Sequence, residues 1–303
     1  MSPRFAAIRP TSQWRQSCDL NFWAFYLHDE GVMKHILVRS TKRGTMMNEL
    51  VFDDFFAERI RVPSLPEQRR IGEFFSTLDS IIAAAERQEA LLRQKKQAYL
   101  QLMFPREGET EPRLRFAGFN GEWETRQASD QFVAVKESHH ADLPVLSATQ
   151  NEGMVYRDDL GIDLKFKEDA LESYKMVRPG DFVISLRSFQ GGFELSDKTG
   201  IVSPAYTVFT HAEISSQDNR YWKQYFKRKA FIESLKTVTF GIRDGKAISF
   251  SDFSSLKCVF PSLPEQRRIG EFFTTLDNLI ATAEQRSESL RALKSAYLQH
   301  MFV

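Results

Sequence analysis

The chain has 303 residues but only two cysteines, Cys18 and Cys258, and these form no ligand or redox motif. So few thiols argue against a disulfide framework and fit the reducing cytoplasm, where we expect the protein to work. The sequence has no signal peptide and no apolar run near 18 residues, so we expect neither export nor a membrane partner. Its 41 basic and 40 acidic residues give a net charge of +1, which excludes a chain-wide polycation.

Sequence motifs for catalysis are missing as well. There is no G-x-x-x-x-G-K-[ST] phosphate loop, no G-x-G-x-x-G after a strand, and no Asn-Pro-Pro-Tyr or Asp-Pro-Pro-Tyr tetrapeptide of amino-methyltransferases. Residues 163–165 have the D-x-K form of a nuclease site but lack a partner carboxylate on a preceding strand. His139 and His140, near Asp142, would point to opposite faces of an extended strand, and no further ligand completes a metal set. We therefore expect no catalytic residue, metal site or cofactor in this chain.

The sequence contains one stretch twice. Residues 63–104 read PSLPEQRRIGEFFSTLDSIIAAAERQEALLRQKKQAYLQLMF, and residues 261–302 read PSLPEQRRIGEFFTTLDNLIATAEQRSESLRALKSAYLQHMF. The offset is 198 throughout, the first 13 positions are identical, and 29 of the 42 aligned positions match. This period is not that of a solenoid, whose units recur about every 20–50 residues. A duplicated module therefore closes each of two larger, more divergent segments.

Each copy has the pattern of one long amphipathic helix. It opens with proline and Glu-Gln-Arg-Arg, which suits a helical first turn, and apolar residues then recur at steps of four and three as a heptad seam. From Pro66 to Phe104 such a helix would be roughly 58 Å long. A seam that long needs a partner, and the other copy is the obvious one, although an ordinary helical bundle is the alternative. The residues that we expect to join the helices and support partner docking are Ile71, Phe75, Leu78, Ile82, Leu92, Tyr99, Ile269, Phe273, Leu276, Ile280, Leu290 and Tyr297.

The segments that precede the two helices resemble each other less closely. Residues 2–5 are similar to 203–206, and residues 51–55 are similar to 249–253. The counterpart of residues 113–200 is missing near the N-terminus, so we expect a shortened gene or a start at an internal methionine. We assign residues 1–61 to the C-terminal part of a first globular domain, 62–104 to a first spacer helix, 105–122 to a linker, 113–260 to a complete second domain, and 261–303 to a second spacer helix.

Local patterns in residues 123–260 predict a domain with both strands and helices. Short β-branched and aromatic runs predict strands at 133–135, 145–147, 182–186 and 201–209, and apolar spacing predicts a helix at 219–235. The predicted fold class is therefore mixed α/β (α+β). Its globular domains are separated by two long antiparallel helices that form a coiled-coil spacer.

A basic window and two glycine-flanked loops point to nucleic acid. Between residues 220 and 246, eight basic side chains stand against two acidic ones, which suits phosphate contacts. The loops at 187–192 and 241–246 carry Arg and Gln, which can bond two atoms of a guanine or adenine edge. An ordinary solvated surface explains the composition equally well. The candidate DNA-binding residues are Arg187, Ser188, Gln190, Lys223, Lys227, Arg228, Arg243 and Lys246.

Together these features resemble the specificity subunit of Type I restriction–modification enzymes. The resemblance is carried by the duplicated Leu-Pro-Glu-Gln-Arg-Arg-Ile-Gly sequence at 65–72 and 263–270. RPGDFVIS at 178–185, VSPAY at 202–206 and FGIR at 240–243 support it. It covers essentially the whole chain.

The resemblance implies DNA recognition without catalysis. In that family each variable domain is a target recognition domain that reads one half of a split double-stranded DNA sequence. The two conserved helices pack antiparallel, fix the distance between the half-sites and dock two modification subunits, which methylate adenine with S-adenosylmethionine. Restriction subunits, driven by ATP with Mg²⁺, join afterwards. Residues 1–61 lack the counterpart of residues 178–192, so we expect one half-site per chain, with a second copy or a separate N-terminal fragment supplying the rest.

Two other interpretations stay open. One is a shortened allele that binds modification subunits through its helices and competes with a full-length specificity subunit without reading DNA. The other is a stand-alone nuclease or methyltransferase, which has no motif behind it. Sequence-dependent DNA binding separates the leading interpretation from the first alternative, and metal-dependent cleavage by the purified chain would support the second.

Overall fold

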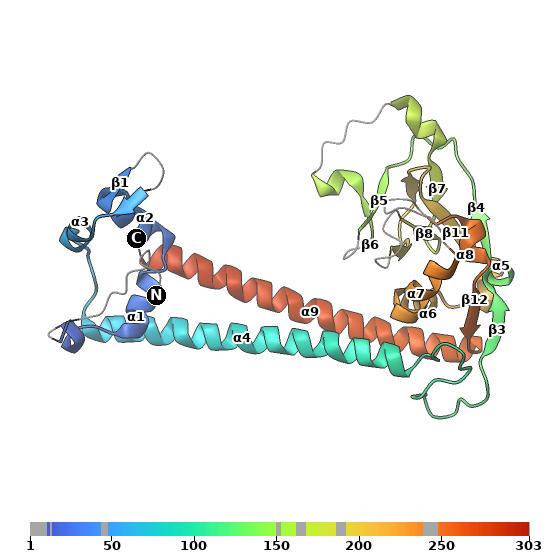
Figure 1. Cartoon of the computed structure of the whole chain (residues 1–303), viewed down its shortest axis with the longest axis horizontal. Helices are drawn as coiled ribbons and strands as arrows, with labels where there is room; N and C mark the ends of the chain where they lie inside the picture. The colour runs from blue at the N-terminus through green and yellow to red at the C-terminus, as the bar shows by residue number, and fades with distance from the viewer. Residues whose placement is uncertain are drawn as a thin grey trace. The chain divides into compact units, whose positions relative to one another are not determined.

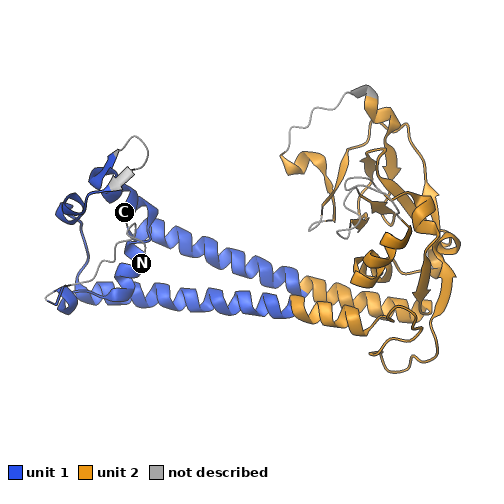
Figure 2. Cartoon of the chain, in the orientation of Figure 1, with its two compact units in different colours: residues 1–92, 279–303 blue, residues 93–278 orange. Residues whose placement is uncertain are grey.

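The structure, a computed structural model, describes residues 11–12, 14–43, 48–149, 153–161, 168–185, 192–238 and 248–302. The chain forms two compact units, of which the first is assembled from two segments that are distant in the sequence and the second is one continuous segment (Figure 2). Unit 1 comprises residues 1–92 and 279–303, and unit 2 comprises residues 93–278. The division falls inside the two long helices, so each unit contains part of both.

The two long helices, α4 (Leu65–Leu102) and α9 (Leu263–Met301), confirm the prediction of one uninterrupted helix per repeat (Figure 1). Each begins with Leu-Pro-Glu. Proline lacks an N–H that the first turn would leave unbonded, and the glutamate lies at the positive end of the helix dipole. Each helix ends one or two residues before the phenylalanine that we predicted as its last residue.

In unit 1, the first part of α4 lies antiparallel to the last part of α9. Asp79 forms an ion pair with Lys294 at 2.5 Å, and the Phe74 ring meets the Tyr297 ring edge to face with centroids 5.1 Å apart. Position numbers therefore rise along one helix as they fall along the other. This confirms the predicted antiparallel pairing for this part of the helices.

The same register holds in unit 2, between the last part of α4 and the first part of α9. Lys96 forms an ion pair with Asp277 at 2.6 Å, and the Tyr99 ring meets the Phe272 ring edge to face at 5.0 Å. At the repeat offset of 198, these are the two contacts of unit 1 with the helices exchanged. These two contacts between the repeats therefore each occur twice.

Unit 2 is built on a four-stranded antiparallel sheet of order β4-β11-β8-β9. Its strands are β4 (Phe132–Val135), β11 (Thr207–His211), β8 (Phe182–Ile184) and β9 (Phe193–Leu195), and three helices, α6 (Asn219–Lys227), α7 (Lys229–Val238) and α8 (Phe250–Ser254), share its core. Phe182 and Phe209 of the sheet stack at 5.4 Å, and Phe209 lies 4.7 Å from Phe253 of α8. Aromatic burial on one face of the sheet holds the helices in place.

The remaining elements of unit 2 are short. The described chain pairs β3 (Glu124–Gln127) with β12 (Lys257–Phe260), β5 (Leu146–Thr149) with β6 (Gly153–Tyr156), and β7 (Lys175–Val177) with β10 (Gly200–Val202). Short helices are α5 (Ala128–Gln131), η2 (Arg157–Leu160), η3 (Glu168–Ser173) and η5 (Ile214–Ser216). Residues 103–123, which include the predicted linker, contain no helix or strand.

Two predicted elements of unit 2 are each divided in the structure. The strand predicted at 201–209 is two strands, β10 and β11, because Tyr206 N–H donates to Ser203 O at 3.0 Å and closes a turn around Pro204. The helix predicted at 219–235 is two helices, α6 and α7, because Arg228 adopts an extended backbone (φ −70°, ψ 140°). Apolar spacing alone did not reveal either break.

The N-terminal part of unit 1 is small and mostly helical. Its elements are η1 (Trp14–Gln16), α1 (Leu20–Tyr26), α2 (Glu30–Ser40), β1 (Thr41–Arg43), β2 (Asn48–Leu50) and α3 (Phe52–Ala57), with β1 and β2 paired antiparallel. Phe22, Trp23 and Tyr26 of α1 form its core, against Ile71 of α4 and Phe302 at the end of the described chain. None of the described helices in either unit has the length and apolarity needed to cross a membrane.

Candidate nucleic-acid interface and docking helices

The two predicted base-reading loops join the described chain at one end of the central sheet. Ser185 N–H donates to Gly192 O at 2.8 Å and closes the β8–β9 hairpin. Thr207 pairs with Ile184 at the end of β8, and its hydroxyl donates to Ile248 O at 2.9 Å. Both ends of the first loop region and the exit of the second therefore lie around the same strand ends. The predicted contacts Arg187, Ser188, Gln190, Arg243 and Lys246 lie outside the described residues.

Lys223 and Lys227, two predicted phosphate contacts, lie on α6. Lys227 forms an ion pair with Glu194 of β9, whose side chain is only 4% exposed. Burial raises the pKa of Glu194, although the nearby lysine acts in the opposite direction. Lys223 is exposed and has no ion pair to any residue that the structure describes. Lys223 thus remains a candidate phosphate contact, whereas the Lys227 charge already compensates a buried carboxylate.

Arg228 is buried, which corrects its assignment as a DNA contact. The residue is 9% exposed, and its guanidinium carbon lies 3.9 Å from the ring centroid of Tyr225 and 4.7 Å from that of Phe104. It also donates hydrogen bonds to Tyr225 O at 3.2 Å and to Pro105 O at 3.4 Å. These contacts fix the corner between α6 and α7 against the chain that follows α4. Counting charges along a sequence does not show which way a side chain points.

Other cations of the basic window are neutralised locally. Arg220 forms an ion pair with Asp218 at 2.7 Å, and Lys236 forms one with Glu233 at 2.8 Å. The local excess of positive charge available to DNA is therefore smaller than the sequence count suggested. Within the described part of this window, Lys223 and Lys229 are the exposed cations without an ion pair, so these two lysines remain candidate phosphate contacts.

The heptad seam is buried where the sequence pattern places it. In unit 1 the buried seam residues are Phe75, Leu78, Ile82 and Ile280, and in unit 2 they are Ile269, Phe273 and Leu276. Ile71, Leu92, Tyr99 and Leu290 are half-buried, and Tyr297 is exposed. Tyr297, although exposed, still contacts Phe74 of the other helix. The role of the seam residues in partner docking stays a prediction.

A repeated contact that the sequence reasoning missed fixes α1 onto α4 in unit 1. The Gln68 carboxamide accepts a hydrogen bond from Asp19 N–H at 3.1 Å and donates one to Pro63 O at 2.9 Å. Gly72, one turn further along, lets α1 approach closely, because a Cβ there would lie 2.6 Å from Asp19 Oδ1 and 2.7 Å from Phe22 N. The invariant glycine of the repeat is therefore a packing residue.

The same contact fixes α6 onto α9 in unit 2. Gln266 accepts from Asp218 N–H at 3.1 Å and donates to Pro261 O at 2.9 Å, and Gly270 gives α6 the same close approach. A sequence signal for this contact exists, since residues 19–26 and 218–225 both read Asp-x-x-(Phe/Tyr)-Trp-x-x-Tyr. Its offset is 199 rather than 198, and its other positions differ.

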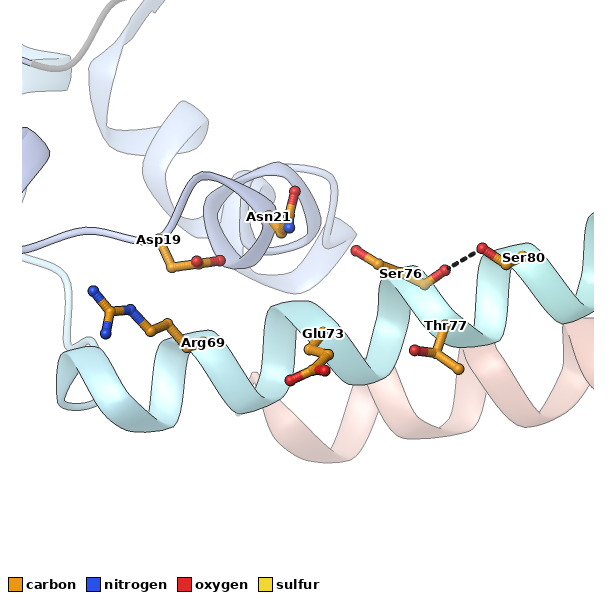
Figure 3. A pocket seen from close by; sticks show the side chains of 7 residues that line it. All are labelled: Asp19, Asn21, Arg69, Glu73, Ser76, Thr77 and Ser80. Atoms are coloured by element: carbon orange, nitrogen blue, oxygen red, sulfur yellow. Dashed lines mark hydrogen bonds between the residues drawn. The ribbon is translucent and has the colours of Figure 1, made fainter.

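A shallow polar depression of about 400 Å³ lies along the α1–α4 contact in unit 1 (Figure 3). Asp19 and Asn21 line it from α1, and Figure 3 shows the Ser80 hydroxyl bonding back to Ser76 O of its own helix at 2.9 Å. The other lining residues are Arg69, Glu73 and Thr77 of α4. In unit 2 the position of Asn21 is held by Arg220, which binds Asp218. The depression is an open groove between α1 and α4, and its lining residues do not form a catalytic arrangement.

The two histidines considered as metal ligands each lie beside a glutamate. His139 Nδ1 lies 3.2 Å from a Glu172 carboxylate oxygen, and His140 Nε2 lies 2.8 Å from Glu137 Oε1. Across the described ranges, no group of three or more His, Cys, Asp or Glu side chains has the arrangement of a metal site. The D-x-K at residues 163–165 lies outside the described residues.

Comparisons with known proteins were made for the sequence and for the fold. The sequence matches the family described as Type I restriction modification DNA specificity domain over residues 125–292. The fold is similar to that of the HsdS subunit from Thermoanaerobacter tengcongensis, with a TM-score of 0.50 and 18% identity over 95% of this chain and 71% of that chain. A chain from a structure that concerns complex assembly and conformational transition of the type I R-M system gives a TM-score of 0.55 and 18% identity. This match covers 97% of this chain and 73% of that chain. The Type-I restriction-modification system S subunit from M. genitalium gives a TM-score of 0.52 and 13% identity, and the match covers 94% of this chain and 73% of that chain. No curated protein matches the sequence.

Proposed function

We propose a division of roles within this chain. The chain belongs to the family of Type I restriction modification DNA specificity domains and is a DNA sequence-recognition subunit of such a system. In this proposal unit 2 reads one half of a two-part DNA target, and the paired helices dock modification subunits. Specificity subunits are themselves non-catalytic, so the proposal places all bond-making and bond-breaking on other chains.

The observation that carries the reading role is the common position of the two loop anchors. Ser185, Gly192 and Ile248 lie around the same ends of β8 and β11, so the first loop starts and ends at this edge of the sheet and the second loop ends there. Loops held by a rigid scaffold are the usual carriers of recognition residues. Arg187 and Arg243 can each bond two atoms of a guanine edge in the major groove.

The repetition within the helix pair supports docking of two copies of one partner. Arg69 and Glu73 are exposed in the first repeat, and their identical counterparts Arg267 and Glu271 are exposed in the second. Packing between the helices does not require exposed residues to match. A surface that occurs once in each unit with the same residues fits two identical modification subunits.

The proposal assigns the cofactors to the partner subunits. The sequence carries neither a phosphate loop nor an amino-methyltransferase tetrapeptide. We therefore place S-adenosylmethionine on the modification subunits, and ATP with Mg²⁺ on restriction subunits that join the same complex.

Unit 1 supports the reading of at most one half-site per chain. Its described strands are β1 and β2, a two-stranded sheet, whereas the loops of unit 2 start from a four-stranded sheet. A second copy of this chain or a separate polypeptide then supplies the other half of the reading surface. A target with inverted halves indicates two copies, and a target with different halves indicates another polypeptide.

Selection of bound duplexes from a random DNA pool, with the chain and modification subunits together, tests the reading role. We expect one short motif to be enriched. Arg187→Ala or Arg243→Ala should cost about 1–3 kcal/mol of binding free energy on that motif and little on random DNA. Lys223→Ala should weaken binding to all sequences about equally and lower the salt dependence by about one ion.

The matched control is Lys42→Ala, which removes an exposed lysine from unit 1 and should change neither binding nor its salt dependence. An equal loss on every sequence for both Arg187→Ala and Arg243→Ala would remove these arginines from the base-reading set. If no motif is enriched although the chain binds modification subunits stably, the shortened competitor is the better account.

A further inference from the structure

The heptad seam differs between the two repeats at one position. It runs through residues 71–103 in the first repeat and 269–301 in the second, and ten positions in each follow the steps of four and three. Nine of these positions carry the same residue in both repeats. The tenth is Glu89 in the first repeat and Ser287 in the second. The two helices therefore present the same seam to a partner except at this position.

Glu89 and Ser287 contact each other in unit 1. Ser287 is 2% exposed and Glu89 is half-buried. The Ser287 hydroxyl lies within hydrogen-bond distance of Glu89 Oε2, at 3.3 Å, and of Glu284 O in its own helix, at 2.9 Å. The numbers of Glu89 and Ser287 differ by 198, which is the offset of the repeat. This contact therefore joins one position of the repeat to the same position of the other copy of the repeat.

A pair formed by the α4 helices of two chains would keep other contacts of unit 1. There, α4 forms ion pairs with a lysine and an arginine of α9 and a ring contact with a tyrosine, and α4 itself carries the same three residues one repeat earlier. The residues of α9 are Lys294, Arg291 and Tyr297, and their counterparts in α4 are Lys96, Arg93 and Tyr99. In the same register, however, Glu89 would face Glu89 of the second chain.

A second glutamate cannot replace Ser287 in this contact. A serine hydroxyl can donate a hydrogen bond to a carboxylate, whereas an ionised carboxylate can only accept. Two carboxylates that face each other across a half-buried seam also repel, and like charges opposed at an interface are strongly unfavourable. A single polar residue in an otherwise apolar seam commonly decides which helix is the partner. Glu89 therefore distinguishes α9 from a second α4.

The order of synthesis gives this distinction a use. Helix α4 ends at residue 102 and α9 begins at residue 263, so 160 residues separate them. At about 5–20 residues per second, the ribosome needs roughly 10–30 s to make that segment. During this time the seam of α4 has no α9 from its own chain. The matching helices that are complete are the α4 helices of other copies in synthesis.

We propose that Glu89 prevents α4 from pairing with the α4 helix of a second copy and so reserves α4 for α9. The charge at residue 89 weakens the one pairing that the rest of the seam would accept. An exchange between two copies that still pairs α4 with α9 keeps the contact of Glu89 with Ser287. A second copy can therefore still take part in the way that the proposed function allows.

Co-expression of two copies with different affinity tags tests this role of Glu89, with the same substitution in both copies. Capture through one tag then measures how much of the other copy is bound. Glu89→Ser should raise the captured fraction about threefold or more over the unsubstituted chain, because serine would then face serine between two α4 helices. Mixing the two copies after separate purification should give no such rise, since each α4 is by then paired within its own chain.

Glu73→Ser is the matched control, because it removes an exposed glutamate of α4 that lies outside the seam. It should leave the captured fraction at the level of the unsubstituted chain. An unchanged fraction in Glu89→Ser, or the same rise in Glu73→Ser, would overturn the proposal.

Ser287→Glu tests the same repulsion inside one chain. It places a carboxylate opposite Glu89 and should raise the equilibrium constant for unfolding of unit 1 roughly tenfold at neutral pH. Adding Glu89→Ser to Ser287→Glu restores one glutamate and one serine, so stability should return to nearly that of the unsubstituted chain. Capture of the second copy should still rise, since α4 then carries serine.

A double variant no more stable than Ser287→Glu alone would overturn the proposal, because the loss would then come from burying a glutamate at residue 287. Neither assay contains DNA or modification subunits. Their outcome therefore leaves the proposed function to be judged separately.

Discussion

The two repeats place one sequence in two environments. Residues 63–75 and 261–273 are identical, and Gln68 and Gln266 make the same two hydrogen bonds in their units. Glu67 is nevertheless exposed, whereas Glu265 is 1% exposed beneath an arginine. The contacts that agree are made within the repeat or to the short helix docked on it. The contacts that differ come from segments outside the repeat.

This difference separates the framework of the molecule from its variable parts. The seam, the glutamine contact and the glycine contact are encoded twice and are formed twice. The sheet and its loops are present in unit 2 and have no counterpart in the described part of unit 1. The repeats therefore provide a common framework, and under the proposed function the sheet and loops carried by unit 2 read DNA.

The largest effect should come from breaking the seam that both units share. Replacing Leu78 and Ile82 together by Glu places two charges at positions that are 7% and 8% exposed. We expect a loss of more than about 4 kcal/mol in the free energy of unfolding of unit 1, because unpaired charges cannot be buried. Docking of modification subunits should be lost with it, as measured by denaturant unfolding and co-purification.

Leu91→Glu and Leu293→Glu are the controls for this change, since both leucines lie on the same helices but are 50% and 45% exposed. They should leave stability and docking nearly unchanged. Assembly that persists after the double substitution at Leu78 and Ile82 would contradict the helix-pair account.

The glycine contact compares the two units directly. In Gly72→Ala a Cβ would lie 2.6 Å from Asp19 Oδ1, and in Gly270→Ala it would lie 2.8 Å from Asp218 Oδ1. Each substitution should cost about 2 kcal/mol in the free energy of unfolding, since the short helix must move away. Gln88→Ala, at an exposed position of α4, should cost nothing. A destabilised Gly270→Ala with an unaffected Gly72→Ala would show that α1 is not docked as α6 is.

Acid should weaken unit 2 through His211 of β11. Burial lowers the pKa of His211 from 6.5 to about 4, so between these values the unfolded chain binds a proton that the folded chain does not. The free energy of unfolding should therefore fall as the pH falls below about 6.5, by about 2 kcal/mol at about pH 5. His211→Phe should remove this component in denaturant titrations at a series of pH values. An unchanged pH dependence in that variant would show that another group is responsible.

The smallest effects should come from the two symmetry-related ion pairs. Lys294→Met and Lys96→Met each remove a partly exposed pair, with Asp79 and with Asp277, and each should cost less than about 1 kcal/mol. High salt should reduce both losses. Asp277 also accepts a hydrogen bond from Gln224 at 3.0 Å, so Lys96→Met leaves it one described partner. Denaturant unfolding at low and at high salt measures the loss in each variant. A loss above about 1 kcal/mol that does not change with salt would indicate that the ion pair is effectively buried.

The long helices could be predicted because their signal is strong and local. A seam of period 3.5 over about five heptads, free of proline after the first turn, allows few other structures. The breaks within unit 2 could not be predicted in the same way. The turn at Pro204 lies inside a run that has the composition of one strand, and the extended backbone at Arg228 lies inside a run with helical spacing. In both cases the packed core decides where the element ends.

The candidate site was predicted only in part. The loop anchors meet because residues 184, 207 and 248 are joined by hydrogen bonds across the sheet, and this pairing is not written in the local sequence. Arg228 was misassigned because its guanidinium binds the ring and carbonyl oxygen of Tyr225, one helical turn before it, and the Phe104 ring and Pro105 carbonyl, which are distant in the sequence. The glutamine contact was readable in principle, from the shared Asp-x-x-(Phe/Tyr)-Trp-x-x-Tyr pattern.

Adenine-methylation mapping is the most direct test of the central claim, that this chain gives a Type I system its DNA specificity. DNA is compared from cells that carry the modification subunit with and without the chain. The account predicts a gapped methylated motif that appears only when the chain is present. Stable co-purification of the chain with the modification subunit, without any such motif, would contradict it.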